Sequence, residues 1–288
     1  MSCPSWTGPP QGRRRRGRAR SAAWLHRPVV DNAKGSIVIT KGHHRAFRRG
    51  GFVGLEKFAT PAEVAASRMI LGGLFSRRAA LAEGHLTDFA APAIDFDRPW
   101  MLQLRYPCDR ASELETLAIR ARAHATARRI LGADAIFAFD HAVIKPPHDG
   151  SPTPWHQDIA FHDAWDRHLN LTFWIPLQDV GPVNDCLHFI AGNHRGQLEA
   201  HQPIGGNRRV RGLGVPRPSS EGAIAVPRPA GGVSIHERRM LRYAGPKRSA
   251  APRRSHALAF KRRRRDWLER QRFGPMLRAP LAGLIRAG

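Results

Sequence analysis

The sequence predicts an α+β domain in which helices come first and a β-barrel or β-sandwich core follows. Two segments have the pattern of a capped helix, TPAE at Thr60–Glu63 and SELE at Ser112–Glu115. In this pattern a Ser or Thr side chain and a Glu three residues later satisfy the amide groups of the first turn. After Gly132 the pattern changes to short segments rich in β-branched and aromatic residues. Helices followed by many short strands are typical of α+β folds.

The first helix is expected to run from Thr60 to about residue 82, with Pro61 at its first helical position. The second is expected to run from near Ser112 to Gly132. Short strands are expected before them, at residues 36–40 and 50–58. Helical spacing predicts two buried faces, made of Val64, Ile70, Leu71, Leu74 and Phe75 in the first helix and of Leu114, Leu117, Ala118, Ala121 and Ala125 in the second.

Two downstream segments are expected to form the main strands, AIFAFDHAVIK at 135–145 and NLTFWIPL at 170–177. Because side chains alternate along a strand, one face of the second segment should pack against the sheet's cover and the other should line an interior. The first face contains Leu171, Phe173, Ile175 and Leu177, and the second contains Asn170, Thr172 and Trp174.

The strong positive charge lies at the two ends of the chain. The formal net charge is +24, but residues 1–50 carry +11 and residues 238–288 carry +14, whereas residues 51–237 sum to −1. Runs such as Arg13–Arg16 and Lys261–Arg265 have the composition of segments that bind phosphate or anionic lipid. Without interleaved aromatic residues or a nucleic-acid-binding motif, solvated tails are the favoured interpretation, and nucleic acid is not expected as the main partner.

Composition divides the chain into three parts. Residues 1–45 are expected to be a basic flexible arm, residues 46–260 a β-barrel domain, and residues 261–288 a basic C-terminal tail. No apolar run approaches the ~18 residues that are needed to cross a bilayer. Three widely spaced cysteines give no disulfide framework, which favours a reducing, cytoplasmic setting.

A histidine and a carboxylate stand two residues apart in PWHQD, at 154–158. Side chains at i and i+2 of an extended segment point to the same side, so His156 and Asp158 can reach one ion. With a third ligand from a distant strand, such a pair forms the two-histidine, one-carboxylate site that holds Fe(II). Taken alone the pair is weak evidence, because the chain has 15 histidines.

Four motifs in order give this pair a context: TPWHQDIAF, NLTFWIPLQDV, PVNDCLHFIAGNHRG and GGVSIHERRMLRYAGPKRSAAPRRSHALAF. Together, over about residues 47–260, they resemble the phytanoyl-CoA dioxygenase family of Fe(II)- and 2-oxoglutarate-dependent oxygenases. The resemblance implies a double-stranded β-helix core, that is, a jelly-roll or cupin-like barrel, with N-terminal flanking helices. It also implies hydroxylation of a small organic substrate by O2, with Fe(II) and 2-oxoglutarate as cofactors and ascorbate as an accessory reductant.

On this resemblance, His156 and Asp158 match the first two iron ligands. The second iron histidine of the family falls on Arg242, in MLRYAGP, and a guanidinium has no lone pair to give a metal. His236 is the weak substitute: it lies six residues upstream, about 20 Å along an extended strand, unless ERRM forms a turn. His188, His194 and His256 have no such support as ligands.

The resemblance also locates the co-substrate pocket. Gln157 and Trp174 match positions that line it in the family. Arg253, eleven residues beyond the distal ligand position, matches the Arg that binds the C5 carboxylate of 2-oxoglutarate, with Lys145 as a weaker second contact. Arg suits this role because its planar fork binds a carboxylate bidentately.

The sequence departs from the family pattern where an Asn-Gly turn becomes Asn184-Asp185, and Asp tolerates a left-handed backbone at some cost. Three hypotheses remain at this point. The first is an active oxygenase, and the second is a catalytically impaired member that keeps the fold and binds a 2-oxo acid or another anion. The third is a nucleic-acid-binding protein that works through its basic ends.

Overall fold

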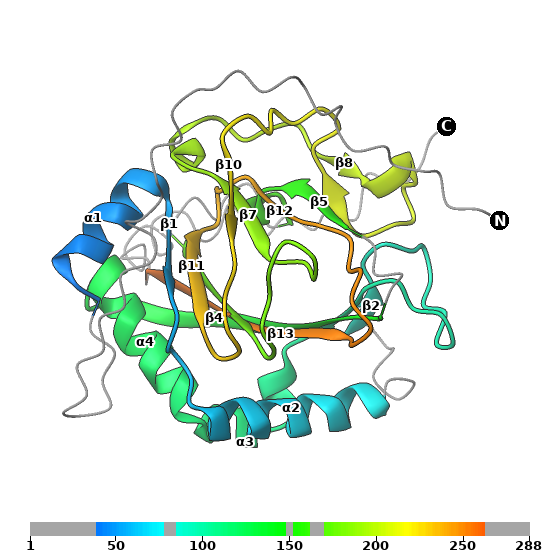
Figure 1. Cartoon of the computed structure of the whole chain (residues 1–288), viewed down its shortest axis with the longest axis horizontal. Helices are drawn as coiled ribbons and strands as arrows, with labels where there is room; N and C mark the ends of the chain where they lie inside the picture. The colour runs from blue at the N-terminus through cyan, green and yellow to red at the C-terminus, as the bar shows by residue number, and fades with distance from the viewer. Residues whose placement is uncertain (1–38, 78–84, 148–151, 162–169, 263–288) are drawn as a thin grey trace, which may run out of the picture.

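Two antiparallel sheets form the core of the domain in the computed structural model, which describes residues 39–77, 85–147, 152–161 and 170–262. The larger sheet has the strand order β1-β11-β6-β13-β4-β3-β2, and the smaller has the order β10-β7-β12-β5. From β5 to β7, and again from β10 to β13, the chain passes alternately between the sheets (Figure 1). This is the winding of a jelly-roll barrel, so the predicted α+β fold with a double-stranded β-helix core is confirmed.

The strands are short apart from two that span the larger sheet. The larger sheet contains β1 (Phe52–Leu55), β2 (Leu86–Asp88), β3 (Leu102–Arg105), β4 (Ala135–Lys145), β6 (Asn170–Pro176), β11 (Val233–Glu237) and β13 (Arg253–Arg262). The smaller contains β5 (Thr153–His156), β7 (Leu187–Ile190), β10 (Ala223–Val226) and β12 (Arg242–Ala244), while β8 (Gln202–Pro203) pairs with β9 (Leu213–Gly214). The two main strands that the sequence predicts are therefore β4 and β6.

The helices α2 (Pro61–Ser76), α3 (Glu113–Thr116) and α4 (Ala118–Leu131) lie against the outer face of the larger sheet (Figure 1). Leu171, Phe173 and Ile175 of β6 pack into this outer core with the helices. Trp174 points the other way, into a second core between the sheets. The predicted alternation of the two faces of β6 is thus confirmed, and its inner face leads to the barrel interior.

Helix α2 begins where it was predicted but ends at Ser76, short of the predicted residue 82, and the second predicted helix is divided in two. The Thr60 hydroxyl accepts from the Glu63 amide, and the Glu63 carboxylate accepts from the Thr60 amide, which completes the capping box. Ser112 makes no side-chain capping bond, and Leu117 is extended, so α3 and α4 are separate. Because α4 restarts after this break, its buried face is Ile119, Ala123, Thr126, Ala127 and Leu131, and the predicted Ala118, Ala121 and Ala125 are exposed.

Regular structure extends slightly beyond the predicted domain boundaries at residues 45 and 260. Helix α1 (Lys41–Gly50) begins at a capping box between Thr40 and His43 and buries Phe47, so the folded domain includes residues from the predicted arm. Likewise β13 continues through Lys261 to Arg262. Residues 39 and 40, at the end of the predicted first strand, are not in a strand, and the remainder of both basic ends lies outside the described residues.

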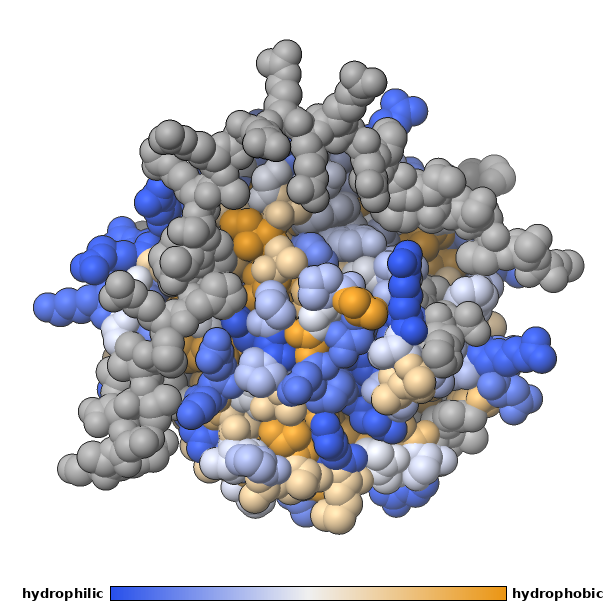
Figure 2. Space-filling view, viewed as in Figure 1, coloured by the Kyte–Doolittle hydropathy of each residue, from blue (hydrophilic) through white to orange (hydrophobic). Residues whose placement is uncertain are grey.

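The described surface has no large apolar face in the view of Figure 2, where hydrophilic side chains surround small hydrophobic patches. The large hydrophobic side chains that are exposed, Met69, Trp100, Val183 and Leu198, come from separate parts of the chain. Among the described residues, no helix is both long and apolar enough to cross a membrane.

Candidate active site

The HQD segment places His156 at the end of β5 and Asp158 at the start of a 3-10 turn (Asp158–Phe161). His156 Nδ1 lies 2.7 Å from the carbonyl oxygen of Pro154. Because a carbonyl only accepts, Nδ1 carries the proton and Nε2 keeps its lone pair. That Nε2 lies 3.5 Å from Asp158 Oδ1. Two atoms that each carry a free lone pair therefore face one another inside the barrel.

Four side chains meet on the buried Asp158 carboxylate. Arg242 contacts Oδ1 through Nε and Nη2, both at 2.7 Å. Thr172 donates to Oδ2 at 3.1 Å, and His236 Nε2 lies 3.3 Å from the same oxygen. Burial alone would raise the pKa of Asp158, but the neighbouring Arg242 and the hydrogen bond from His236 hold this pKa well below its usual value. Asp158 is therefore a carboxylate at neutral pH.

A turn brings both His236 and Arg242 to this carboxylate. His236 lies in β11 of the larger sheet and Arg242 in β12 of the smaller one. The chain reverses between them, with the Met240 amide donating to the Glu237 carbonyl at 2.9 Å. In the smaller sheet Arg242 pairs with His156. The turn that the sequence left open at ERRM therefore exists, and it brings His236 close to Asp158.

The positions of His156 and Asp158 fit an iron ion, but a third ligand is not in place beside them. His156 Nε2 and Asp158 Oδ1 are separated by 3.5 Å, close to the ~3 Å between neighbouring ligands of an octahedral ion bound at ~2.1 Å. Arg242, which the resemblance aligns with the third ligand, contacts the carboxylate and neutralises it. Among the described residues, His156, Asp158 and His236 do not bring three donor atoms within 4.8 Å of one another. A closed three-ligand site would therefore need Arg242 to leave Asp158.

The described residues bring three such donor atoms within 4.8 Å at Cys108, Asp140 and His256. This cluster lies on the helix-covered side of the larger sheet. Asp140 Oδ2 is 2.8 Å from His256 Nε2 and accepts from the Cys108 amide at 3.2 Å. Burial and the Asp140 charge raise the pKa of the Cys108 thiol, so it is protonated. We interpret the cluster as a hydrogen-bonded anchor between the turn before α3 and the sheet.

The imidazoles around Asp158 are neutral. Burial lowers the pKa of His156 and, in the same way, that of His236, and in His156 the neighbouring Arg242 lowers it further. His141 on β4 faces the same cavity, and burial lowers its pKa to about 4. No motif in the sequence indicates His141 as a site residue, although its place within the predicted strand AIFAFDHAVIK is a signal for it.

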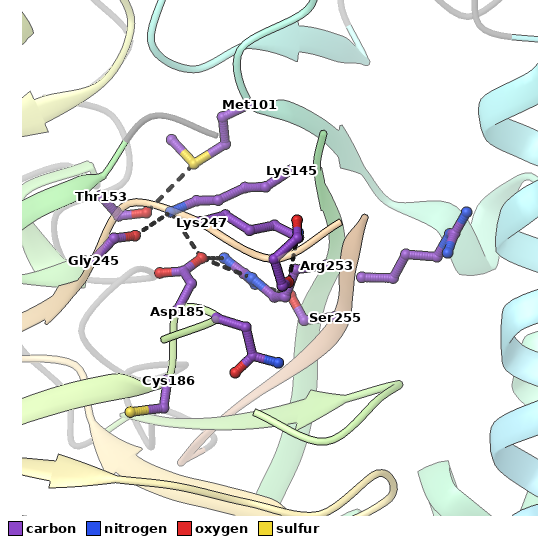
Figure 3. Close-up of polar contacts among 12 residues, drawn as sticks. Met101, Lys145, Thr153, Asp185, Cys186, Gly245, Lys247, Arg253 and Ser255 are labelled. Atoms are coloured by element: carbon purple, nitrogen blue, oxygen red, sulfur yellow. Dashed lines mark hydrogen bonds and ion pairs between the residues drawn. The ribbon is translucent and has the colours of Figure 1, made fainter. Parts of the chain in front are cut away.

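The predicted co-substrate anchor is already paired within the chain (Figure 3). Arg253 is buried, and its Nη2 and Nε lie 2.6 and 2.8 Å from Asp185 Oδ2. Lys145 Nζ contacts the same oxygen at 2.9 Å. The guanidinium of Arg253 also lies 5.4 Å from the centre of the Trp174 ring. The structure thus brings Arg253, Lys145 and Trp174 together, and it adds Asp185, for which the sequence predicts only a left-handed backbone.

Gln157, which the resemblance places at the co-substrate pocket, is directed elsewhere in this structure. Its side chain donates to the Arg239 carbonyl at 2.7 Å and accepts from the Glu199 amide at 2.8 Å. It does not line the cavity, because side chains of successive residues after β5 diverge and Gln157 turns toward the segment near residue 199. Gln157 therefore fastens neighbouring segments instead of contacting a co-substrate.

A cavity of about 270 Å³ joins the two clusters. His156, Asp158, Trp174, Arg242 and Arg253 all line it. Among its described lining residues Asp158 alone is acidic, whereas five are arginines: Arg105, Arg211, Arg238, Arg242 and Arg253. The walls also include apolar side chains, namely Phe89, Met101, Phe139, Val143, Phe161 and Leu187. A cavity of this charge attracts small anions.

A jelly-roll barrel with a buried His-x-Asp pair facing a cavity is the architecture of the non-haem Fe(II)- and 2-oxoglutarate-dependent oxygenases. The family model described as phytanoyl-CoA dioxygenase (PhyH) matches residues 47–255. The chain belongs to this family, and hence to a class of 2-oxoglutarate-dependent oxygenases, as its sequence motifs predict. No curated protein matches the chain.

Solved structures agree with this membership. The chain is 30% identical to EvdO2 from Micromonospora carbonacea var. aurantiaca, which was crystallised with 2-oxoglutarate. The two structures superpose with a TM-score of 0.68, and the match covers 79% of this chain and 93% of EvdO2. SnoK, a non-heme α-ketoglutarate-dependent carbocyclase from nogalamycin biosynthesis, shares the fold at 20% identity, with a TM-score of 0.62 and coverage of 81% and 91%. The epimerase SnoN, crystallised with Fe3+ and α-ketoglutarate, shares it at 22% identity, with a TM-score of 0.58 and coverage of 76% and 82%.

Proposed function

We propose that this protein is an Fe(II)- and 2-oxoglutarate-dependent dioxygenase that hydroxylates a small organic anion. Its family membership supports the reaction class. The substrate charge rests on one observation, the cavity with five arginines and a single carboxylate that Arg242 already neutralises. Arg238 and the more exposed Arg105 and Arg211 line this cavity without a paired acid among its lining residues. They would draw an anionic substrate in, and the apolar walls would exclude water around it.

In this proposal His156 and Asp158 hold the iron, which supplies the activation of O2 when it is bound. His156 is ready for this role because its Nδ1 proton is fixed on Pro154 and its Nε2 lone pair points inward. Arg242 must first release Asp158. His236 is the nearest candidate for a third donor, since its Nε2 is already 3.3 Å from the carboxylate. Arg253 would hold the co-substrate carboxylate beside Trp174.

The test is anaerobic loading of the full chain with Fe(II), followed by measurement of retained iron and of succinate released from 2-oxoglutarate in air. The proposal expects the unaltered protein to retain iron and to release succinate. Asp158→Asn should abolish both results, and His236→Ala should lose iron if His236 is the third donor. The exposed Glu221→Gln is a matched control for the loss of one carboxylate, and it should retain both properties.

A second candidate function is favoured by the ion pair between Arg242 and Asp158. In a catalytically impaired member, Arg242 would permanently take the place of the metal, and the barrel would bind a 2-oxo acid or another anion without turnover. Arg242→His decides between the two. If the unaltered protein retains no iron and Arg242→His gains both iron and succinate release, the impaired member is correct and the oxygenase proposal fails.

We also propose a reducing, cytoplasmic setting, supported by the buried free thiols of Cys108 and Cys186. Nucleic acid is outside the proposed function, because residues 51–237, between the basic ends, sum to a net charge of −1. Affinity for DNA that persists at high salt would contradict this view, since binding through the tails alone falls steeply with salt.

A further inference from the structure

Asp185 lies in the turn before β7, where its backbone is left-handed with φ of 75°. The preceding Asn184 holds this turn, accepting from the Gly181 amide at 2.6 Å and donating to the Asp179 carbonyl at 2.7 Å. The turn directs the Asp185 side chain into the barrel wall, where it is completely buried. Figure 3 shows that Lys145 and Arg253 converge on it.

We infer that Asp185 is a specificity-determining residue, a built-in carboxylate that occupies the cationic pair Arg253 and Lys145 and so competes with the distal carboxylate of a dicarboxylic 2-oxo acid. This inference rests on the proposed function only in taking Arg253 as the anchor of the co-substrate. The chemical class it disfavours is the 2-oxo diacid. A 2-oxo acid that has no second carboxylate does not need this pair and meets no such competition.

The Asp185 carboxylate contacts Arg253 and Lys145 through only one of its two oxygens. All three donors, Lys145 Nζ and the Nε and Nη2 of Arg253, reach a single oxygen, Oδ2. The other oxygen, Oδ1, is buried and has no hydrogen-bond partner among the described residues. Leaving a buried charged acceptor unpaired is unfavourable. A carboxylate arriving from the cavity side could instead engage the guanidinium with both oxygens.

The charges around Asp185 also favour replacement by an outside anion. Two buried cations share one carboxylate, and Arg253 is itself a lining residue of the cavity. The remaining polar contacts are to uncharged groups: Arg253 Nη1 donates to Ser255 Oγ at 2.9 Å and Lys145 Nζ to the Gly245 carbonyl at 3.4 Å. Removing the Asp185 charge would therefore leave a strongly anion-binding pair of which Arg253 lines the cavity.

The substitutions that remove the Asp185 charge are also compatible with the left-handed backbone at this position. Glycine adopts a φ of 75° without strain, and asparagine tolerates it well. Asp185→Gly removes the carboxylate and its side chain, and Asp185→Asn removes only the charge while keeping nearly the same size. The two variants together separate loss of competition from a change of shape, and Asp185→Asn remains informative if Asp185→Gly does not fold.

The experiment is calorimetric titration of the full chain with 2-oxoglutarate and, separately, with 2-oxobutyrate, in EDTA and again with Mn(II). We expect Asp185→Gly to bind 2-oxoglutarate about 10- to 100-fold more tightly than the unaltered protein, as expected for regained charge-assisted hydrogen bonds. Asp185→Asn should show a smaller gain. Affinity for 2-oxobutyrate should change less than about threefold, and Glu221→Gln should change neither affinity.

Equal gains for both acids, or no gain for 2-oxoglutarate in folded Asp185→Gly and Asp185→Asn, would overturn the inference. A second readout is the melting temperature, which 2-oxoglutarate should raise more in Asp185→Gly than in the unaltered protein. Titration in EDTA does not involve iron or turnover. Tighter binding by the variants without iron retention or succinate release would therefore contradict the proposed oxygenase function and leave the role of Asp185 intact.

Discussion

Two buried carboxylates in this barrel are each held by an arginine, and they differ in what else surrounds them. Asp158 meets Arg242 together with two neutral imidazoles and a hydroxyl, so its charge is balanced. Asp185 meets Arg253 and Lys145, so its cluster carries a net positive charge. The Asp158 cluster is therefore suited to exchange its cation for another cation, and the Asp185 cluster to exchange its anion for another anion.

The largest expected effect comes from breaking the balanced pair with Arg242→Leu. Without Arg242 the Asp158 charge is buried and uncompensated, so we expect the free energy of unfolding at pH 7 to fall by about 3–5 kcal/mol. Urea denaturation measures this loss. The exposed Arg217→Leu, as a matched control, should change stability by less than about 0.5 kcal/mol.

The pH dependence of that loss has a defined sign. The pKa of Asp158 is lowered in the folded protein, so its pairing stabilises the fold above the unfolded pKa of about 3.9 and is lost as pH falls through the folded pKa. The deficit of Arg242→Leu should therefore be largest at neutral pH and shrink below about pH 4. A deficit that is independent of pH would show that packing, and not charge, is the role of Arg242.

The next largest effect is expected from a variant in which Asp185, like Asp158, contacts a single cation. Burial lowers the pKa of Lys145 from 10.5 to about 8, so between these values the unfolded chain binds more protons and stability rises with pH. Lys145→Met should remove a rise of about 2–3 kcal/mol across this window. The difference between the two proteins, measured by urea denaturation from pH 7 to 10, checks it, and parallel profiles would contradict it.

A smaller effect is expected for Gln157, which lies between His156 and Asp158 in sequence but belongs to neither cluster. Gln157→Leu removes the hydrogen bonds to the Arg239 carbonyl and the Glu199 amide, which should cost about 1–3 kcal/mol of stability. Affinity for 2-oxoglutarate, measured by calorimetry, should change less than about threefold. A large loss of affinity with little loss of stability would restore the role that the sequence predicted.

The smallest effect should come from Thr172→Val, which keeps the shape of the side chain on β6 and deletes its hydrogen bond to Asp158 Oδ2. We expect a loss of about 1 kcal/mol and a small rise in the pKa of Asp158, observable by NMR titration of the carboxyl carbon. An unchanged pKa would mean that Arg242 and His236 alone hold Asp158 in its charged form.

Much of this fold and part of the site could be predicted from the sequence. The HQD pair, Trp174 and Arg253 do face one cavity, because strand alternation and motif order fix which side chains point inward. The pairing of Arg253 with Asp185 could not be predicted, since it depends on a turn that brings residues 68 positions apart into contact. For the same reason the nearness of His236 to Asp158 required knowledge of the reversal between β11 and β12.

The left-handed backbone at residue 185 has a consequence for how this pocket can change over evolution. Few residue types accept that conformation, and the ones that do, glycine, asparagine and aspartate, differ mainly in charge and in side-chain length. A single substitution among them would determine whether residue 185 occupies Arg253 and Lys145 or leaves them available to an outside carboxylate, while the sheets stay unchanged. The ligand preference of such a barrel can therefore be altered at one position without rebuilding the fold.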